Sequence, residues 1–240
     1  MANQNPEATA TDAGPPLGGY DRYAIYWVPQ PGEPLAQAGA AWLGWDPSTG
    51  EWDPAREADG RVAAPRRYGL HATLKAPFRL AEDRSVDDLD NALASFAATR
   101  RTAIGPGLGL DDGLGFMALR PLAPSPQIDN LAADCVTVFD RFRAPVTPED
   151  RVRAGADRMS PRQRALFEAH GYQYILDLFR FHITLTGPLS AEQISKTALE
   201  LNDRFGSLLT PAFRIHTITL LGDPGGDAGF RLLRHYALTG

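Results

Sequence analysis

Two histidines occur in the same sequence context, and their chemistry is where the chain is most informative. The stretch from Tyr68 to Phe78 reads YGLHATLKAPF, and the stretch from Phe179 to Leu189 reads FRFHITLTGPL. Aligned without gaps, the two stretches share four residue types, at His71/His182, Thr73/Thr184, Leu74/Leu185 and Pro77/Pro188. The repetition predicts a duplicated unit that presents an imidazole and a hydroxyl twice.

Both repeats have the alternation of a β-strand, in which successive side chains point to opposite faces. The expected buried face carries Leu70, Ala72 and Leu74 in the first repeat and Phe179, Phe181, Ile183 and Leu185 in the second. The opposite face carries Arg67, His71, Thr73 and Lys75, and then Arg180, His182, Thr184 and Thr186. We therefore expect each strand to pack its apolar side on a core and to present its polar side to a ligand.

An imidazole pair of this kind suits acid–base chemistry at phosphorus. Histidine has an unperturbed pKa of ~6.5, so one ring can be neutral while the other is protonated. The threonine hydroxyls can donate to phosphate oxygens, and Lys75, Arg67 or Arg180 can offset charge that builds in a transition state. In-line displacement needs a proton removed from water on one side and another donated to the leaving oxygen. The pattern predicts a phosphoesterase that needs no metal or other cofactor and acts on a small phosphorylated substrate.

Three other interpretations were weighed against this one. A single His-x-Thr on a strand is usually structural, but two copies in matching contexts favour a function. A metal site is poorly supported, because no carboxylate or cysteine lies at ligand spacing from either histidine. The non-enzymatic alternative is a phosphate-binding module whose histidines only donate hydrogen bonds. Tyr26 and Tyr68 are weaker candidates for contact with a substrate, since aromatic residues in strands mostly belong to the core.

The elements around the two repeats also match. A polar start followed by apolar residues at helical spacing predicts helices at 85–99 and 190–205, one after each repeated strand. Each helix leads to two strand candidates, at 103–110 and 116–119 in the first half and at 213–221 and 230–238 in the second. A strand at 22–28 precedes the first repeat. Residues 1–19 contain almost nothing apolar and are expected to form a disordered tail.

Between the halves lies a segment without a counterpart. A helix is expected from Asp129 to Phe142, with Asp129 as its N-cap, and a second from Ser160-Pro161 to a stop at Gly171. This segment is rich in arginine, and a few of these side chains, Arg143 among them, are candidates for contact with an anionic ligand.

The bulk composition limits the class of protein. The 240 residues are 43% hydrophobic, which is ample for a sizeable core, and the net charge of −5 argues against a surface built for nucleic acid. Cys135 is the only cysteine, so no intramolecular disulfide can form, and a reducing cytoplasm is expected. No apolar run reaches the ~20 residues that span a bilayer, and no signal peptide or membrane contact is expected.

The paired motifs His71-Ala72-Thr73 and His182-Ile183-Thr184 resemble those of the two-histidine (2H) phosphoesterase superfamily. That resemblance implies an α+β fold with two pseudo-twofold lobes, in which two antiparallel sheets line a central cleft and helices lie outside. It also implies that the histidines act as acid and base and that the threonines bind phosphate. The activities of that superfamily include hydrolysis of cyclic phosphodiesters and processing of 2′,3′-cyclic or 2′-5′ RNA linkages, so short RNA ends are the alternative substrate.

The chain from about Tyr20 to its end is similar to one branch, the phosphonate-metabolism protein family. The likeness rests on Arg22-Tyr23-Ala24-Ile25-Tyr26, on Pro65 to Phe78, on Phe142-Arg143-Ala144-Pro145 and on the arginine-bearing stretch near Ser160. It implies a cyclic sugar or nucleotide phosphate as the substrate. We expect lobe one at about 20–125, a helical insertion at about 126–172 and lobe two at about 173–240. The motifs lie 111 positions apart, and we expect the insertion to cap the cleft.

Overall fold

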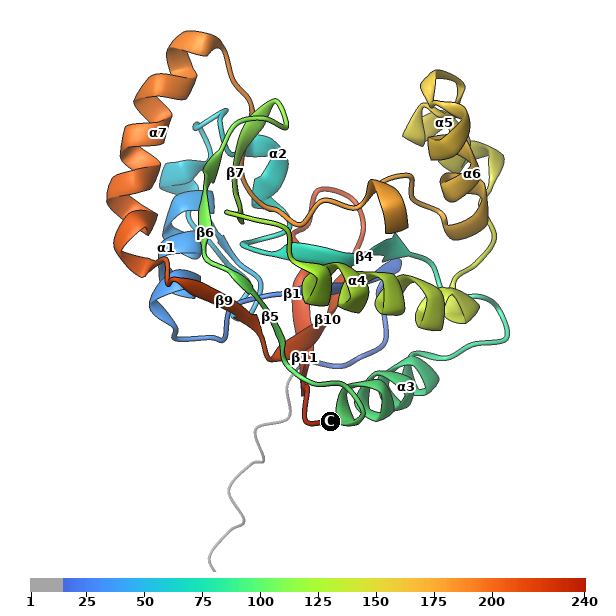
Figure 1. The fold of residues 1–240 in the computed structure, drawn as a ribbon. Helices are drawn as coiled ribbons and strands as arrows, with labels where there is room; N and C mark the ends of the chain where they lie inside the picture. The colour runs from blue at the N-terminus through green and yellow to red at the C-terminus, as the bar shows by residue number, and fades with distance from the viewer. Residues whose placement is uncertain (1–14) are drawn as a thin grey trace, which may run out of the picture.

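The computed structural model describes residues 15–240, so most of the predicted tail lies outside the described residues. The last part of that predicted tail is folded, since Leu17 packs against the core and its carbonyl accepts a hydrogen bond from the Tyr23 hydroxyl at 3.0 Å. The fold is α+β with antiparallel strands, as expected (Figure 1). None of the helices in this part of the chain has the length and apolar character needed to cross a membrane.

The largest sheet has seven antiparallel strands in the order β11-β10-β1-β4-β8-β7-β6. Their bounds are β1 Arg22–Trp27, β4 Ala72–Phe78, β6 Leu108–Asp111, β7 Phe116–Pro121, β8 Ile183–Pro188, β10 Thr217–Asp223 and β11 Arg231–Ala237. Two smaller sheets pair β2 (Trp45–Asp46) with β3 (Glu51–Trp52) and β5 (Ala103–Pro106) with β9 (Ala212–Ile215). The two repeated strands, β4 and β8, are neighbours inside the large sheet.

The two halves of the chain exchange strands, which corrects the expected division into a first and a second lobe. Strands β10 and β11 of the second half pair on the outer side of β1, whereas β6 and β7 of the first half pair beside β8. Each lobe therefore contains strands from both halves. The pairs β4·β8 and β5·β9 join equivalent strands of the two repeats, so they lie on the pseudo-twofold axis.

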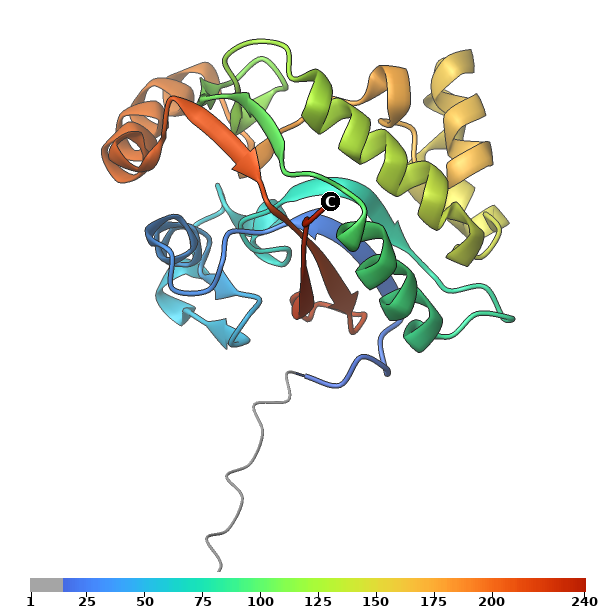
Figure 2. The same cartoon turned by 60° about the horizontal axis from the view of Figure 1, so that its bottom comes forward.

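The helices predicted after each repeat are confirmed. Helix α3 spans Val86–Ala98 and α7 spans Ala191–Phe205, and each begins with a capping box at a serine, Ser85 or Ser190. Helix α3 contacts β10 and β11, and α7 contacts β6, so each helix covers strands that come from the other half of the chain (Figures 1 and 2). Helices α1 (Pro34–Leu43) and α2 (Ala63–Arg66) lie in the long connection between β1 and β4.

The segment between the halves forms three α-helices, α4 (Pro126–Phe139), α5 (Pro148–Ala154) and α6 (Pro161–His170). Helix α4 begins after Ser125 rather than at Asp129, because Pro126 occupies its first position, and Asp129 lies in the first turn. Helix α6 starts at Ser160 and ends at Gly171, whose φ of 78° is the left-handed conformation that glycine adopts readily. Side chains of α4, including the buried Cys135, belong to the main core, whereas α5 and α6 stand to one side (Figure 1).

Candidate active site

The two His-x-Thr motifs meet where the lobes join. Strands β4 and β8 share a single register pair, Ala72 with Ile183. Because the strands run antiparallel, this pair places His71 across from Thr184, and His182 across from Thr73. All four side chains are half-buried, whereas the backbone pair between them is closed to solvent. The structure thus brings together the four residues that the sequence singled out first.

The two imidazoles are held by equivalent hydrogen bonds. The Nδ1 atom of His71 lies 2.9 Å from the carbonyl oxygen of Gly69, and Nδ1 of His182 lies 2.7 Å from that of Arg180. A carbonyl oxygen can only accept, so Nδ1 carries the proton in each ring. Within residues 15–240 no hydrogen bond is made to either Nε2, and that atom is the unprotonated nitrogen of the neutral ring. Each Nε2 is therefore available to take or give a proton.

Burial lowers the basicity of both rings. The pKa of His71 is lowered to about 4, chiefly by burial and to a smaller extent by the charge of His182, while the hydrogen bond to Gly69 opposes the decrease. Burial likewise lowers the pKa of His182, while its hydrogen bond to Arg180 acts in the opposite direction and the Arg120 guanidinium adds to the decrease. The effect of the His182 charge on His71 agrees with the pairing of Ala72 and Ile183, the residues that follow the two histidines.

The surroundings of the two rings differ. The ring of Tyr26 stacks on His71 with centroids 4.2 Å apart and an interplanar angle of 26°. Tyr68 lies beside the same imidazole at 5.6 Å, so His71 is enclosed by aromatic groups. The ring of His182 has one aromatic neighbour of this kind, Phe116 at 5.7 Å. Both tyrosine candidates therefore lie at the site, as walls of the His71 half.

A cavity of about 320 Å³ opens beside His182 and Thr73. Its walls are formed largely by the segment that leads into β8, namely Tyr172, Tyr174, Ile175, Leu178, Phe179 and Arg180, together with Leu114 and Phe116 from the turn before β7 and the start of that strand. This size suits a small ligand. The end of the predicted insertion thus lines the cavity, and Arg180 stands exposed at its edge, where its guanidinium donates to the carbonyls of Asp177 and Phe179.

Lys75 does not lie on the face of His71, which corrects the prediction from strand alternation. Tyr26 pairs with Thr73 but Ile25 pairs with Lys75, so Leu74 is an extra residue that bulges out of the ladder. The bulge turns Lys75 to the face of Ile25, where it is 3% exposed and its Nζ lies 3.1 Å from Asp140. The equivalent Thr186 of β8 also follows a register shift and is fully buried, accepting a hydrogen bond from the Met117 amide.

The remaining two candidates are engaged in ion pairs near the site. Arg67 binds Asp223 at 2.9 Å, and its guanidinium lies 5.7 Å from the centre of the Tyr68 ring. Arg143 binds Asp140 at 2.9 Å and donates to the carbonyls of Ala144 and Ala169. Arg67 is thus placed behind the aromatic wall of His71, and Arg143 lies farther along the strand, beside Lys75.

Several residues that shape this region were not singled out by the sequence analysis. Tyr172 lines the cavity beside His182, and burial raises its pKa to about 12, with further increases from Tyr174 and Tyr68. Asp223, 1% exposed, holds both Arg22 and Arg67. The aromatic run Tyr172-Gln173-Tyr174 just before the second motif was the available signal for Tyr172. Nothing local marks Asp223 as a partner of residues that lie 156 and 201 positions earlier.

Comparison with known proteins identifies a family and two curated relatives. Residues 73–231 match the family described as "Protein of unknown function (DUF1045)". The chain belongs to this family. Two curated relatives of the DUF1045 chain, from Janthinobacterium sp. (strain Marseille) and Laribacter hongkongensis (strain HLHK9), are both named ribose 1,5-bisphosphate phosphokinase PhnN. Each is 36% identical, over 178 and 223 residues, or 70% and 89% of this chain. The chain spans only 39% and 51% of their lengths.

Solved structures similar to the DUF1045 chain include one described as a phosphoesterase, at 14% identity and a TM-score of 0.43, covering 92% of this chain and 99% of the other. Another is Escherichia coli LigT complexed with NADP+, at 15% identity and a TM-score of 0.40, covering 93% and 100%. A third is Kluyveromyces marxianus Usb1, at 10% identity and a TM-score of 0.34, covering 91% and 99%.

Proposed function

We propose that this protein is a two-histidine phosphoesterase that hydrolyses a small cyclic phosphodiester. The observation that carries the proposal is the matched tethering of His71 and His182, which leaves Nε2 of each ring free beside a threonine of the facing strand. One Nε2 takes the proton of the attacking water and the other, protonated, donates to the leaving oxygen. Thr73 and Thr184 donate to the phosphate oxygens. The reaction needs no metal ion.

A cyclic sugar phosphate is the substrate class that we favour. The relatives that share part of their length with this chain are named for ribose 1,5-bisphosphate, a sugar with a phosphate on its anomeric oxygen. Closing such a phosphate onto the adjacent hydroxyl gives a cyclic phosphodiester, and hydrolysis of that ring at the second oxygen regenerates the monoester. The sequence resemblance implies that the protein acts in phosphonate metabolism, and the breakdown of phosphonates would supply such a sugar. The cavity of about 320 Å³ has room for one.

The test is hydrolysis of a panel of cyclic phosphates, followed by phosphorus NMR, in the presence and absence of EDTA. Ribose 1,2-cyclic phosphate, adenosine 2′,3′-cyclic phosphate and a 2′-5′-linked dinucleotide represent the sugar, nucleotide and RNA-end classes. We expect turnover of the cyclic sugar, unaffected by EDTA, and none by His71→Gln. Turnover of the dinucleotide alone would replace the proposal with RNA-end processing. Tight binding of a cyclic phosphate by both wild type and His71→Gln, without hydrolysis by either, would indicate a binding module.

A further inference from the structure

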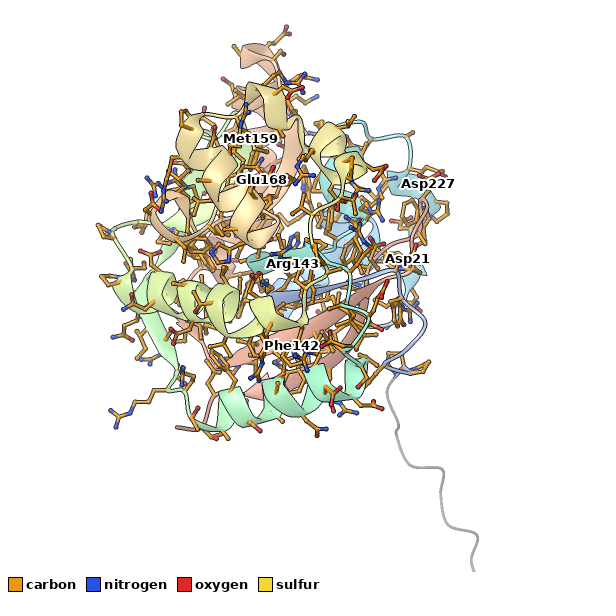
Figure 3. The ribbon with its side chains drawn as sticks, turned by 90° about the vertical axis from the view of Figure 1, so that its right-hand side faces the viewer. Asp21, Phe142, Arg143, Met159, Glu168 and Asp227 are labelled. Carbon is orange, nitrogen blue, oxygen red and sulfur yellow. The ribbon has the colours of Figure 1, made fainter. Side chains whose placement is uncertain are left out.

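A second cavity, of about 290 Å³, lies on the other side of Tyr172 from the first. It is bounded by the end of β4, by β1 and by the segment that carries α5 and α6. Four of its lining residues are arginines, Arg22, Arg79, Arg143 and Arg153. Figure 3 looks onto this side of the molecule and shows Arg143 between α6 above and α4 below. The mechanism proposed above uses none of these four side chains.

The charges around this cavity do not balance. Each of three carboxylates is shared by two cations: Asp223 by Arg22 and Arg67, Asp150 by Arg79 and Arg153, and Asp140 by Lys75 and Arg143. The surplus is three positive charges, and Asp150 is the only acid among the described residues that line the cavity. Glu149 lies near Arg79 but is exposed outside it. The pairs fix the arginines in place and still leave an electropositive hollow.

The partial burial of Arg143 and Arg22, and a free donor on Arg22, also suit the binding of an anion. Arg143 is 12% exposed and Arg22 is 28% exposed, so a ligand between them is partly removed from water. The guanidinium of Arg22 uses Nε and Nη2 on Asp223, which leaves Nη1 to donate. Planar guanidinium groups bind phosphate oxygens in pairs, and a dianionic phosphate monoester matches the surplus charge better than a carboxylate does.

The two cavities meet at the aromatic wall of the catalytic site. Tyr172 lines both, and Tyr68 lines the arginine cavity while it stands beside His71. We propose that the arginine cavity binds a phosphate monoester carried by the same molecule whose cyclic phosphodiester lies between His71 and His182. The proposal rests on the proposed function and narrows it. The substrate is then a sugar with two phosphate groups, one cyclic and one a monoester.

Binding of ribose 5-phosphate, a monoester without a ring phosphate, tests the cavity separately from catalysis. Measured by calorimetry, Arg79→Gln should weaken binding about tenfold. Asp150→Asn should tighten it, because the competing carboxylate is lost while an amide can still cap α5. Both substitutions break the same ion pair, so damage to the fold would weaken binding in both, whereas the proposal requires opposite signs. Arg151→Gln, in the same helix and outside the cavity lining, is the matched control and should change nothing.

Turnover completes the test with two substrates, ribose 1,2-cyclic phosphate with and without a 5-phosphate. We expect the 5-phosphate to raise kcat/KM at least tenfold in wild type, and Arg79→Gln to shrink that ratio. Equal kcat/KM for the two sugars, or parallel effects of Arg79→Gln and Asp150→Asn on binding, would overturn the cavity assignment while leaving the phosphoesterase intact. Opposite binding effects without hydrolysis of either sugar would support the cavity and reject the phosphoesterase.

Discussion

His71 and His182 occupy equivalent places, each directly before its strand, β4 or β8, and each ring is tethered through Nδ1 to the carbonyl two residues earlier. Their surroundings have diverged. His71 is stacked on Tyr26 and has a pKa lowered to about 4, whereas His182 borders an open cavity with Arg120 as the neighbouring charge. The duplication thus preserved the orientation of two imidazoles and changed their environments. This is how one residue type can serve as base on one side and acid on the other.

Replacing either histidine tests whether the two halves are equally necessary. His71→Ala and His182→Ala should each lower kcat for a cyclic phosphodiester by about 100-fold or more, the usual contribution of general acid–base catalysis. Single-turnover measurements on the purified variants would show it, with circular dichroism as the check that both remain folded. If one variant keeps normal turnover, only the other histidine is catalytic, and the two histidines are not an acid–base pair.

The pH dependence of kcat/KM reports the two rings in the free enzyme. The base must be neutral and the acid protonated, so activity should fall below pH about 4 and also above the pKa of His182, which lies under the ordinary 6.5. Beyond each limit the loss is about tenfold per pH unit. A bound phosphate raises the pKa of both rings, so the profile of kcat should move to higher pH. A flat profile between pH 3 and 9 would contradict acid–base roles for both histidines.

Thr73→Val and Thr184→Val should lower kcat/KM by several-fold to about tenfold each, because each loses one hydrogen bond to the phosphate. Thr186→Val is the matched control, because Thr186 lies on β8 with Thr184. Its hydroxyl accepts from the Met117 amide inside the core, so its loss should cost about 1–3 kcal/mol in the free energy of unfolding and leave turnover of the folded protein unchanged. Denaturant titrations measure the loss of stability, and steady-state kinetics measure the loss of kcat/KM. A large loss of turnover in Thr186→Val would mean that the register shift in β8 does not place Thr186 in the core and away from the site.

Arg120→Gln assigns one limb of the pH profile to one ring. The Arg120 charge lowers the pKa of His182 and is not among the influences on His71. Removing this charge should move the limb of His182 to higher pH and should leave the limb near pH 4 in place. Movement of the lower limb instead would assign that limb to His182 and reverse the comparison.

The repeated motif predicted much of the local structure correctly. The strand–helix units around His71 and His182, the start of α6 at Ser160 and its stop at Gly171 all follow from short-range patterns, and the structure confirms them. Such features depend on residues within a few positions of each other, which is why the sequence alone carries them.

Long-range features could not be predicted in the same way. The exchange of β6 and β7 for β10 and β11 between lobes depends on pairing between distant segments, which strand alternation does not determine. Lys75 was placed on the wrong face because the bulge at Leu74 interrupts the two-residue period. Its half-buried partner Asp140 lies on a different element, so the ion pair had no local signal.

The lobes touch through one register pair in the large sheet, Ala72 with Ile183, and this has a mechanical consequence. On either side of that pair, the ladder of β4 continues with β1 and that of β8 with β7, while β8 is also held by hydrogen bonds from the Gly187 amide to the Arg61 carbonyl and from the Trp42 indole to the Leu185 carbonyl. A small rotation about the junction would change the gap between the two Nε2 atoms without breaking any ladder bond within either lobe. The single register pair is therefore the point of the large sheet about which the distance between the two imidazoles can change, and the β5·β9 pair and the shared hydrophobic core are the other connections that limit such a rotation.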